Sequence, residues 1–220
     1  MNRIKPFFLL VVLITLGTSS YSQNMDLPTD YIRNTGFGKN DIPSNVKGTP
    51  FLNKNFTPVQ LKINNKTINA QMRYDAYRDA FQLKQSNGNV YLNKNSQMGI
   101  TYLNKDYSLL EYYDDNEIRR IGYLQTMTEN DNLKIFKKHI KIFTEGEEAI
   151  NSYTTDKPAK FEDDVKYFIA IDSKMPKEVK LKRRDIIRFF NDKKVKSYIK
   201  DKKLKFRDED DLYTLAEYLN

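Results

Sequence analysis

One histidine and no cysteine limit the chemistry open to this 220-residue chain. A histidine-based metal site or catalytic triad would have one copy of its central residue, His139, and no thiolate beside it. His139 falls in an alternating segment, 133–143, where it shares a face with Lys137 and Lys141. Because neighbouring cations lower the pKa of an imidazole and repel a metal ion, we predict a solvent-facing structural histidine.

Acidic residues gather in four clusters, at 114–117, 145–148, 162–164 and 208–211. None has the bend glycine and distal glutamate of a calcium loop. Two carboxylates that flank a glycosidic bond must lie about 5–10 Å apart, which the sequence does not establish, so a hydrolase stays the least favoured alternative. The sequence contains no nucleophile elbow and no phosphate loop. We therefore expect no catalytic residue, no metal ligand, no cofactor and no enzyme activity.

Positive charge is concentrated between residues 177 and 207, where 14 lysines and arginines face four acids. The whole chain has a formal net charge of +8, so the rest of it is slightly acidic. The candidate partner-binding residues lie mostly off an apolar helical stripe: Lys193, Lys194, Lys196, Lys200, Lys202 and Lys203. A solvated helix face is the favoured interpretation of this block. The alternative is a binding surface, whose expected partner is an envelope protein or an anionic envelope surface. Nucleic acid is disfavoured because the segment is rich in lysine rather than arginine.

The first 22 residues have the layout of a secretory signal peptide. A basic head with Arg3 and Lys5 precedes an apolar run, 7–16, and the segment 20–22 fits cleavage before Gln23. The run is too short to span a bilayer comfortably, and no cysteine follows it to carry a lipid. We expect an exported protein, periplasmic or extracellular and peripheral to the outer membrane, with no transmembrane span after cleavage.

The rest of the chain changes pattern twice. Residues 23–49, rich in Asn, Gly, Pro and Thr, predict an extended N-terminal arm. Between 50 and 182, short alternating runs separated by polar turns predict an antiparallel sheet, because strands this close cannot be joined by crossover helices. Residues 183–220 show helical spacing, with Asp208 as the expected N-cap of the last helix.

These segments predict one globular domain of the α+β class, mainly β. We expect a large curved antiparallel meander or partial barrel, followed by two or three C-terminal amphipathic helices packed on the sheet. Nothing in the sequence sets an oligomeric state.

Three segments carry a resemblance to a known group of proteins. Gly48-Thr-Pro-Phe-Leu52, followed after a hairpin by Met72-Arg-Tyr-Asp-Ala-Tyr-Arg-Asp79, resembles a pattern in uncharacterised exported proteins of the Bacteroidota. The closing segment, from Phe190 to Leu212, is similar to their C-terminal helices. The resemblance implies an envelope location and a β-then-α order, and it implies no activity.

The favoured function is therefore a non-catalytic exported cell-envelope protein, an accessory or interaction subunit of an outer-membrane or periplasmic assembly. The alternative is a periplasmic binding protein that holds a glycan, a lipid or another small envelope ligand in the curved sheet.

Overall fold

The computed structural model describes residues 27, 29–33, 46–64, 66–129, 132–147 and 155–219. The predicted signal peptide, 1–22, and the cleavage point before Gln23 lie outside these described residues, as does much of the predicted arm. Among the helices in the described ranges, none combines the length and the apolar character needed to cross a membrane.

The described chain is mainly β and ends in helices, which confirms the predicted fold class. A short 3₁₀ turn, η1 (Thr29–Tyr31), comes first. The strands are β1 (Ile32–Arg33), β2 (Thr57–Ile63), β3 (Lys66–Asp75), β4 (Ala80–Gln85), β5 (Gly88–Leu92), β6 (Gly99–Tyr102), β7 (Lys105–Tyr113), β8 (Arg119–Glu129), β9 (Leu133–Thr144), β10 (Lys160–Ile171) and β11 (Lys177–Val179). The helices are α2 (Arg183–Phe190), α3 (Lys193–Asp201) and α4 (Asp210–Tyr218).

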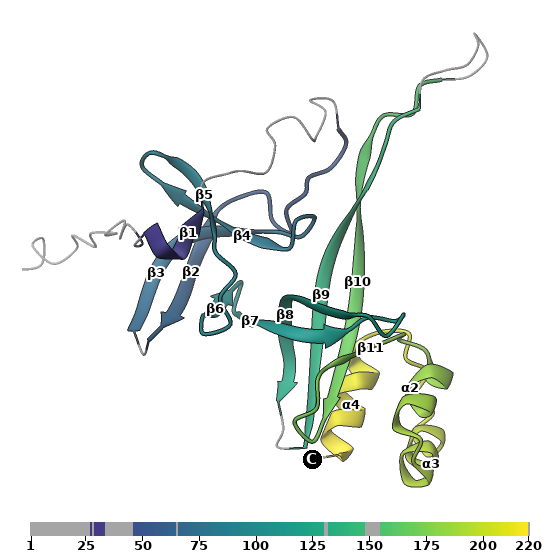
Figure 1. Cartoon of the computed structure of the whole chain (residues 1–220). Helices are drawn as coiled ribbons and strands as arrows, with labels where there is room; N and C mark the ends of the chain where they lie inside the picture. Colours follow the sequence, from purple (N-terminus) through teal and green to yellow (C-terminus); the bar gives the residue numbers. More distant parts are fainter. Residues whose placement is uncertain are drawn as a thin grey trace, which may run out of the picture.

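The strands form one 11-stranded sheet (Figure 1). Strands β2 to β5 pair as consecutive antiparallel hairpins, as their alternation and turns predict. Strand β6 then returns to pair with β2, with Val59 opposite Tyr102, so the strand order departs here from the sequence order that we expected. Strand β1, which lies within the predicted arm, pairs with β5.

From β7 onward the sheet curves back on itself. Strands β7 to β11 pair antiparallel in sequence order. Strand β11 then meets β7 in parallel, with Lys177 opposite Tyr113. The first and fifth strands of a meander run in the same direction, so contact between them must be parallel. This pair is the one exception to the predicted antiparallel pairing among the described strands, and it makes the sheet a partial ring.

Aromatic rings fill the inner side of the sheet around β2 to β8. Five buried rings contact one another there, and the centroids of contacting pairs lie 4.9–6.4 Å apart: Tyr74, Phe81, Tyr102, Tyr107 and Tyr123. Offset and edge-on contacts of this kind add to the burial of large apolar area. These rings therefore form the core on this side of the sheet.

The three helices bury their apolar stripes against β9, β10 and β11, as expected from their spacing. Ile186 of α2, Ile199 of α3 and Leu215 of α4 are all fully buried. Each such side chain contributes roughly 1.5–3 kcal/mol relative to an exposed one. Phe189 and Phe190 are only half-buried at the edge of this core.

One helix cap differs from the prediction. Helix α4 begins after Glu209, not Asp208, and the Glu209 side chain makes no capping bond. Asp208 instead accepts a bond from the N–H of Asp210 at 3.2 Å, which shapes the turn before the helix. Asp192 is the residue that does cap a helix, since its carboxylate accepts from the N–H groups of Lys194 and Val195 at the start of α3.

Candidate functional site

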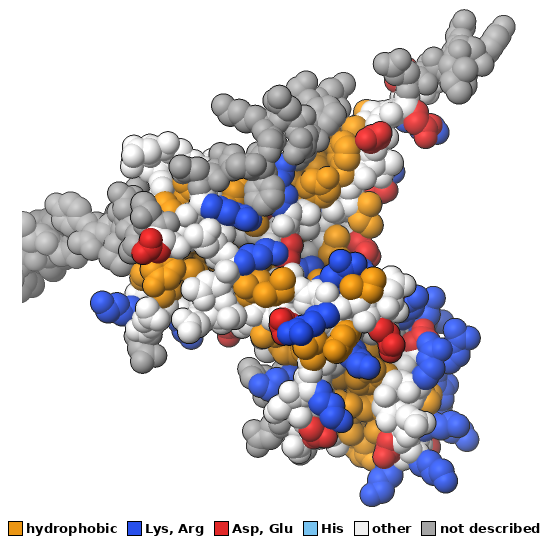
Figure 2. Space-filling view, in the orientation of Figure 1, with side chains coloured by type: hydrophobic (Ala, Val, Ile, Leu, Met, Phe, Trp, Pro, Cys, Tyr) orange, Lys and Arg blue, Asp and Glu red, His pale blue; other side chains and the backbone are white. Residues whose placement is uncertain are grey.

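Six lysines on α3 and on the turn that follows it form the candidate binding surface. We call it the lysine surface, and it comprises Lys193, Lys194, Lys196, Lys200, Lys202 and Lys203. All six residues are exposed. In Figure 2 the blue side chains gather along the outer side of α2 and α3. The structure therefore places every lysine that the sequence singled out on one outward-facing element.

The apolar residues of α3 decide which side of the helix carries the lysines. Val195 and Ile199 are buried in the core that α3 shares with α2 and α4. Because these residues lie one turn apart, they fix the inward side of the helix. Lys193, Lys196 and Lys200 follow an i, i+3, i+7 spacing on the outward side and form a single stripe within about 60° of the helix circumference.

The charges of the lysine surface are not neutralised from within the described chain. Among the described residues, none of the six ammonium groups makes an ion pair. The neighbouring helix differs, because Arg188 and Arg184 of α2 both lie beside the carboxylate of Asp185. Asp192 is occupied as the cap of α3. The lysines of α3 are therefore available to an external acidic group.

A stacked pair of rings lies on another side of α3. The rings of Tyr198 and Tyr218 are 3.8 Å apart and tilted by 8°. Tyr218 is 42% exposed and belongs to α4. Tyr198 is about 140° around α3 from Lys193, so the exposed ring does not lie among the stripe lysines.

His139 is not the solvent-facing residue that we expected. It is half-buried, and its Nε2 lies 3.2 Å from Oε1 of Gln125, which also accepts a bond from the Tyr107 hydroxyl. Burial, aided by the nearby Lys137 ammonium, lowers the pKa of His139 from its usual 6.5 to about 4. Alternation within a strand could not reveal this, because both faces of β9 are covered in part by other elements.

The acidic clusters serve turns and ion pairs. Asp114 accepts bonds from the N–H groups of Asn116 and Ile118, which close the turn between β7 and β8 and hold the pKa of its carboxyl below the usual value. The pairs that hold the other clusters are Glu147 with Lys157, Glu162 with Lys160, Asp163 with Lys141, and Glu209 with Lys137.

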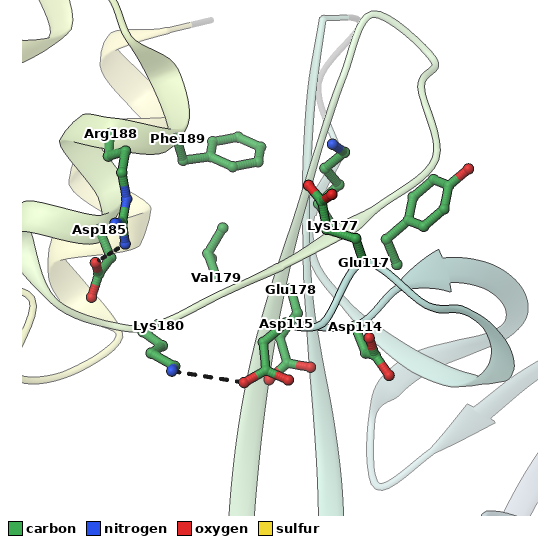
Figure 3. A pocket seen from close by; sticks show the side chains of 11 residues that line it. Asp114, Asp115, Glu117, Lys177, Glu178, Val179, Lys180, Asp185, Arg188 and Phe189 are labelled. Carbon is green, nitrogen blue, oxygen red and sulfur yellow. Dashed lines mark hydrogen bonds and ion pairs between the residues drawn. The ribbon is translucent and has the colours of Figure 1, made fainter.

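A pocket of about 420 Å³ lies between the β7–β8 turn, β11 and α2, and it contains several carboxylates (Figure 3). Figure 3 shows that the Asp115 carboxylate lies toward the Lys180 ammonium, 3.7 Å away, and that Asp185 is paired with Arg188. Asp114 and Glu178 also line the pocket, and they pair with Arg120 and Lys166. Four of the pocket's carboxylates therefore contact cations of the chain itself.

Sequence reasoning missed a buried ionic centre around Asp79. Its carboxylate lies 2.8 Å from the Lys138 ammonium and 2.9 Å from that of Lys94, and it accepts a bond from the Tyr74 hydroxyl at 2.7 Å. Burial raises the pKa of Asp79, but the two ammonium groups lower it more, so the net shift is downward. A Cβ on Gly122 would lie 2.5 Å from both the Asp79 carboxylate and the Lys138 ammonium. Any Cβ there would force the ion pair to shift, so glycine lets β8 approach the pair as it stands.

Two of the segments that carry the resemblance, 48–52 and 72–79, lie against each other. The N–H of Leu52 bonds to the carbonyl of Tyr74, and the N–H of Ala76 bonds to that of Pro50, both at 2.9 Å. The guanidinium of Arg73 lies over the ring of Phe51 at 3.5 Å. These contacts are structural, and they join the end of β3 to the chain that leads into the sheet.

Within the described part of the chain, no three His, Cys, Asp or Glu residues form a group that could hold a metal ion. Comparisons with protein-family models, with curated proteins and with solved structures gave no match.

Proposed function

We propose that this protein is an exported, non-catalytic protein of the cell envelope. It acts as an accessory or interaction subunit of an outer-membrane or periplasmic assembly and binds an acidic partner there. The observation that carries the proposal is the lysine surface, whose six ammonium groups are exposed and free of ion pairs within the described chain.

The charge of this surface supports binding to an acidic partner. Residues 193–203 hold six lysines and one acid, Asp201, so their net charge is +5. Two opposite unit charges 4 Å apart in water attract each other by about 1 kcal/mol. Several such contacts are therefore needed together for measurable binding. The Debye length falls from ~30 Å at 0.01 M salt to ~8 Å at 0.15 M, so the association is weak and sensitive to salt.

The location rests on the sequence. The basic head, apolar run and small residues of 1–22 support export, and the resemblance to exported proteins of the Bacteroidota supports the envelope.

The test is co-sedimentation of the mature protein with native envelopes across this salt range. A six-lysine variant changes every residue of the lysine surface to glutamine. Its matched control changes six exposed lysines elsewhere and loses the same charge: Lys47, Lys54, Lys62, Lys66, Lys84 and Lys105. Retention that falls with salt and with the first variant, but not with the control, supports the proposal. If retention changes neither with salt nor in the six-lysine variant, the proposal is contradicted.

A second candidate function is the binding of a small envelope ligand. Aromatic rings fill the inner side of the sheet, but a separate pocket of about 460 Å³ opens between β7 and β10. Leu110, Phe136 and Ala170 line it, with Lys174 also among the lining residues. Its size is within the usual range for ligand pockets, and its lining fits a small anionic amphiphile. Saturable binding of a fluorescent fatty acid that weakens in Lys174→Glu supports this function, and the absence of saturable binding contradicts it.

A further inference from the structure

Resting on the proposed function, we propose that the acidic partner is a membrane surface. The stripe of Lys193, Lys196 and Lys200 lies flat against the phosphate headgroups of an anionic lipid layer, and no part of α3 enters the hydrocarbon.

The arrangement of the lysines on α3 suits contact with a flat surface. The three stripe lysines fall within about 60° of the circumference of α3 and are all exposed, so they can meet one flat layer together. Lys194 and Lys202 lie around the sides of the helix, and Lys203 follows its end with a left-handed backbone, φ 55°. These three flank lysines cannot approach the same plane as closely.

Lysine, rather than arginine, suits phosphate groups that are not held in one fixed geometry. The charged side chains of α3 and its following turn that form this surface are lysines, whereas the arginines Arg184 and Arg188 of α2 lie beside Asp185. Arginine favours fixed two-point recognition of a carboxylate or phosphate, whereas lysine is a hydrated point charge on a flexible stem. Lysine clusters are the usual means of attraction to anionic lipids.

The apolar side of α3 excludes insertion. An amphipathic helix that enters a membrane presents an exposed apolar face to the lipid. In α3 the apolar residues Val195 and Ile199 are buried against the body of the protein. The attachment is therefore electrostatic and reversible.

The positions of the aromatic rings disfavour an anionic glycan. Recognition of a charged sugar by stacking needs an exposed ring beside the cations. The exposed ring, Tyr218, stacks on Tyr198, which lies on a different side of α3 from the stripe.

The test uses the mature protein and two triple variants with equal charge loss. One changes the stripe, K193Q/K196Q/K200Q, and the other changes the flanks, K194Q/K202Q/K203Q. Sedimentation is measured with phosphatidylcholine vesicles that contain or lack phosphatidylglycerol, and with native envelopes. Circular dichroism confirms that each exposed substitution leaves the fold intact.

Each lysine at an anionic surface is worth about a fivefold change in partition. We expect binding only to vesicles with phosphatidylglycerol, about a 100-fold loss for the stripe variant, and less than about a tenfold loss for the flank variant. Equal losses from the two triples overturn the planar arrangement. If native envelopes retain the protein but phosphatidylglycerol vesicles do not, the lipid proposal is wrong and the proposed function stands with an acidic protein partner. If neither retains it, both proposals fail.

Discussion

Replacing Asp79 by asparagine tests the ion pair that joins the turn between β3 and β4 to Lys138 of β9. The side chain of Lys138 is 8% exposed and that of Asp79 is 19% exposed, so their ion pair is largely withdrawn from water. Asp79→Asn keeps an oxygen for the N–H of Tyr123 but leaves the Lys138 ammonium buried without a counter-charge. Removing one partner of a buried pair costs about 3–5 kcal/mol, and the residual exposure of Asp79 favours the lower end.

Lys94 provides the matched control. It bonds to the same carboxylate, but its side chain is 30% exposed and can turn to solvent. Lys94→Gln should therefore cost less than about 1 kcal/mol. A third variant, Asp79→Asn with Lys138→Met, removes the buried charge and should be more stable than Asp79→Asn alone.

The assay is urea unfolding of the mature protein, followed by circular dichroism at neutral and acidic pH. The folded-state pKa of Asp79 is lowered, so its stabilising effect is present above the unfolded pKa of about 3.9 and is lost as pH falls through the folded value. The difference between the wild type and Asp79→Asn should therefore shrink in acid. A cost below about 1 kcal/mol for Asp79→Asn at neutral pH, or one equal to that of Lys94→Gln, would refute the reasoning.

Four further outcomes are expected. Gly122→Ala should destabilise the fold, because the new Cβ would lie 2.5 Å from the Asp79–Lys138 pair; unchanged urea midpoints would contradict this. Asp192→Ala should cost about 1 kcal/mol by removing the cap of α3, which the same unfolding assay measures. Phe189→Ala and Phe190→Ala should each cost roughly 1.5–3 kcal/mol, less than a fully buried phenylalanine, because both rings are half-buried; a change of less than about 0.5 kcal/mol for both would mean that neither ring contributes to the helix core. Mass spectrometry of the exported protein should give an N-terminus at Gln23, and an intact Met1 would contradict cleavage.

Local patterns predicted the elements that depend on near neighbours. The alternation of β2 and β3 around the turn after Ile63 predicted their hairpin, and the spacing of Val195 and Ile199 predicted the buried side of α3. The same spacing placed the lysine surface outward, so the candidate site could be found from the sequence.

Features that depend on distant segments could not be predicted. The return of β6 to β2 and the parallel contact of β11 with β7 join residues whose local sequences carry no mark of the pairing. The Asp79 carboxylate contacts Lys94, which follows β5, Lys138 of β9 and the backbone N–H of Tyr123 in β8. His139 could not be assigned as half-buried, because Gln125 reaches it from another strand.

Fractionation of the producing cells tests the central claim most directly. The wild type, the six-lysine variant and the charge-matched control are followed from the envelope pellet into a wash with about 1 M salt, at which the Debye length is ~3 Å. We predict that the wild type and the control sediment with the envelope and are released by the wash, whereas the six-lysine variant stays in the exported soluble fraction. An identical distribution of all three proteins would contradict binding through the lysine surface.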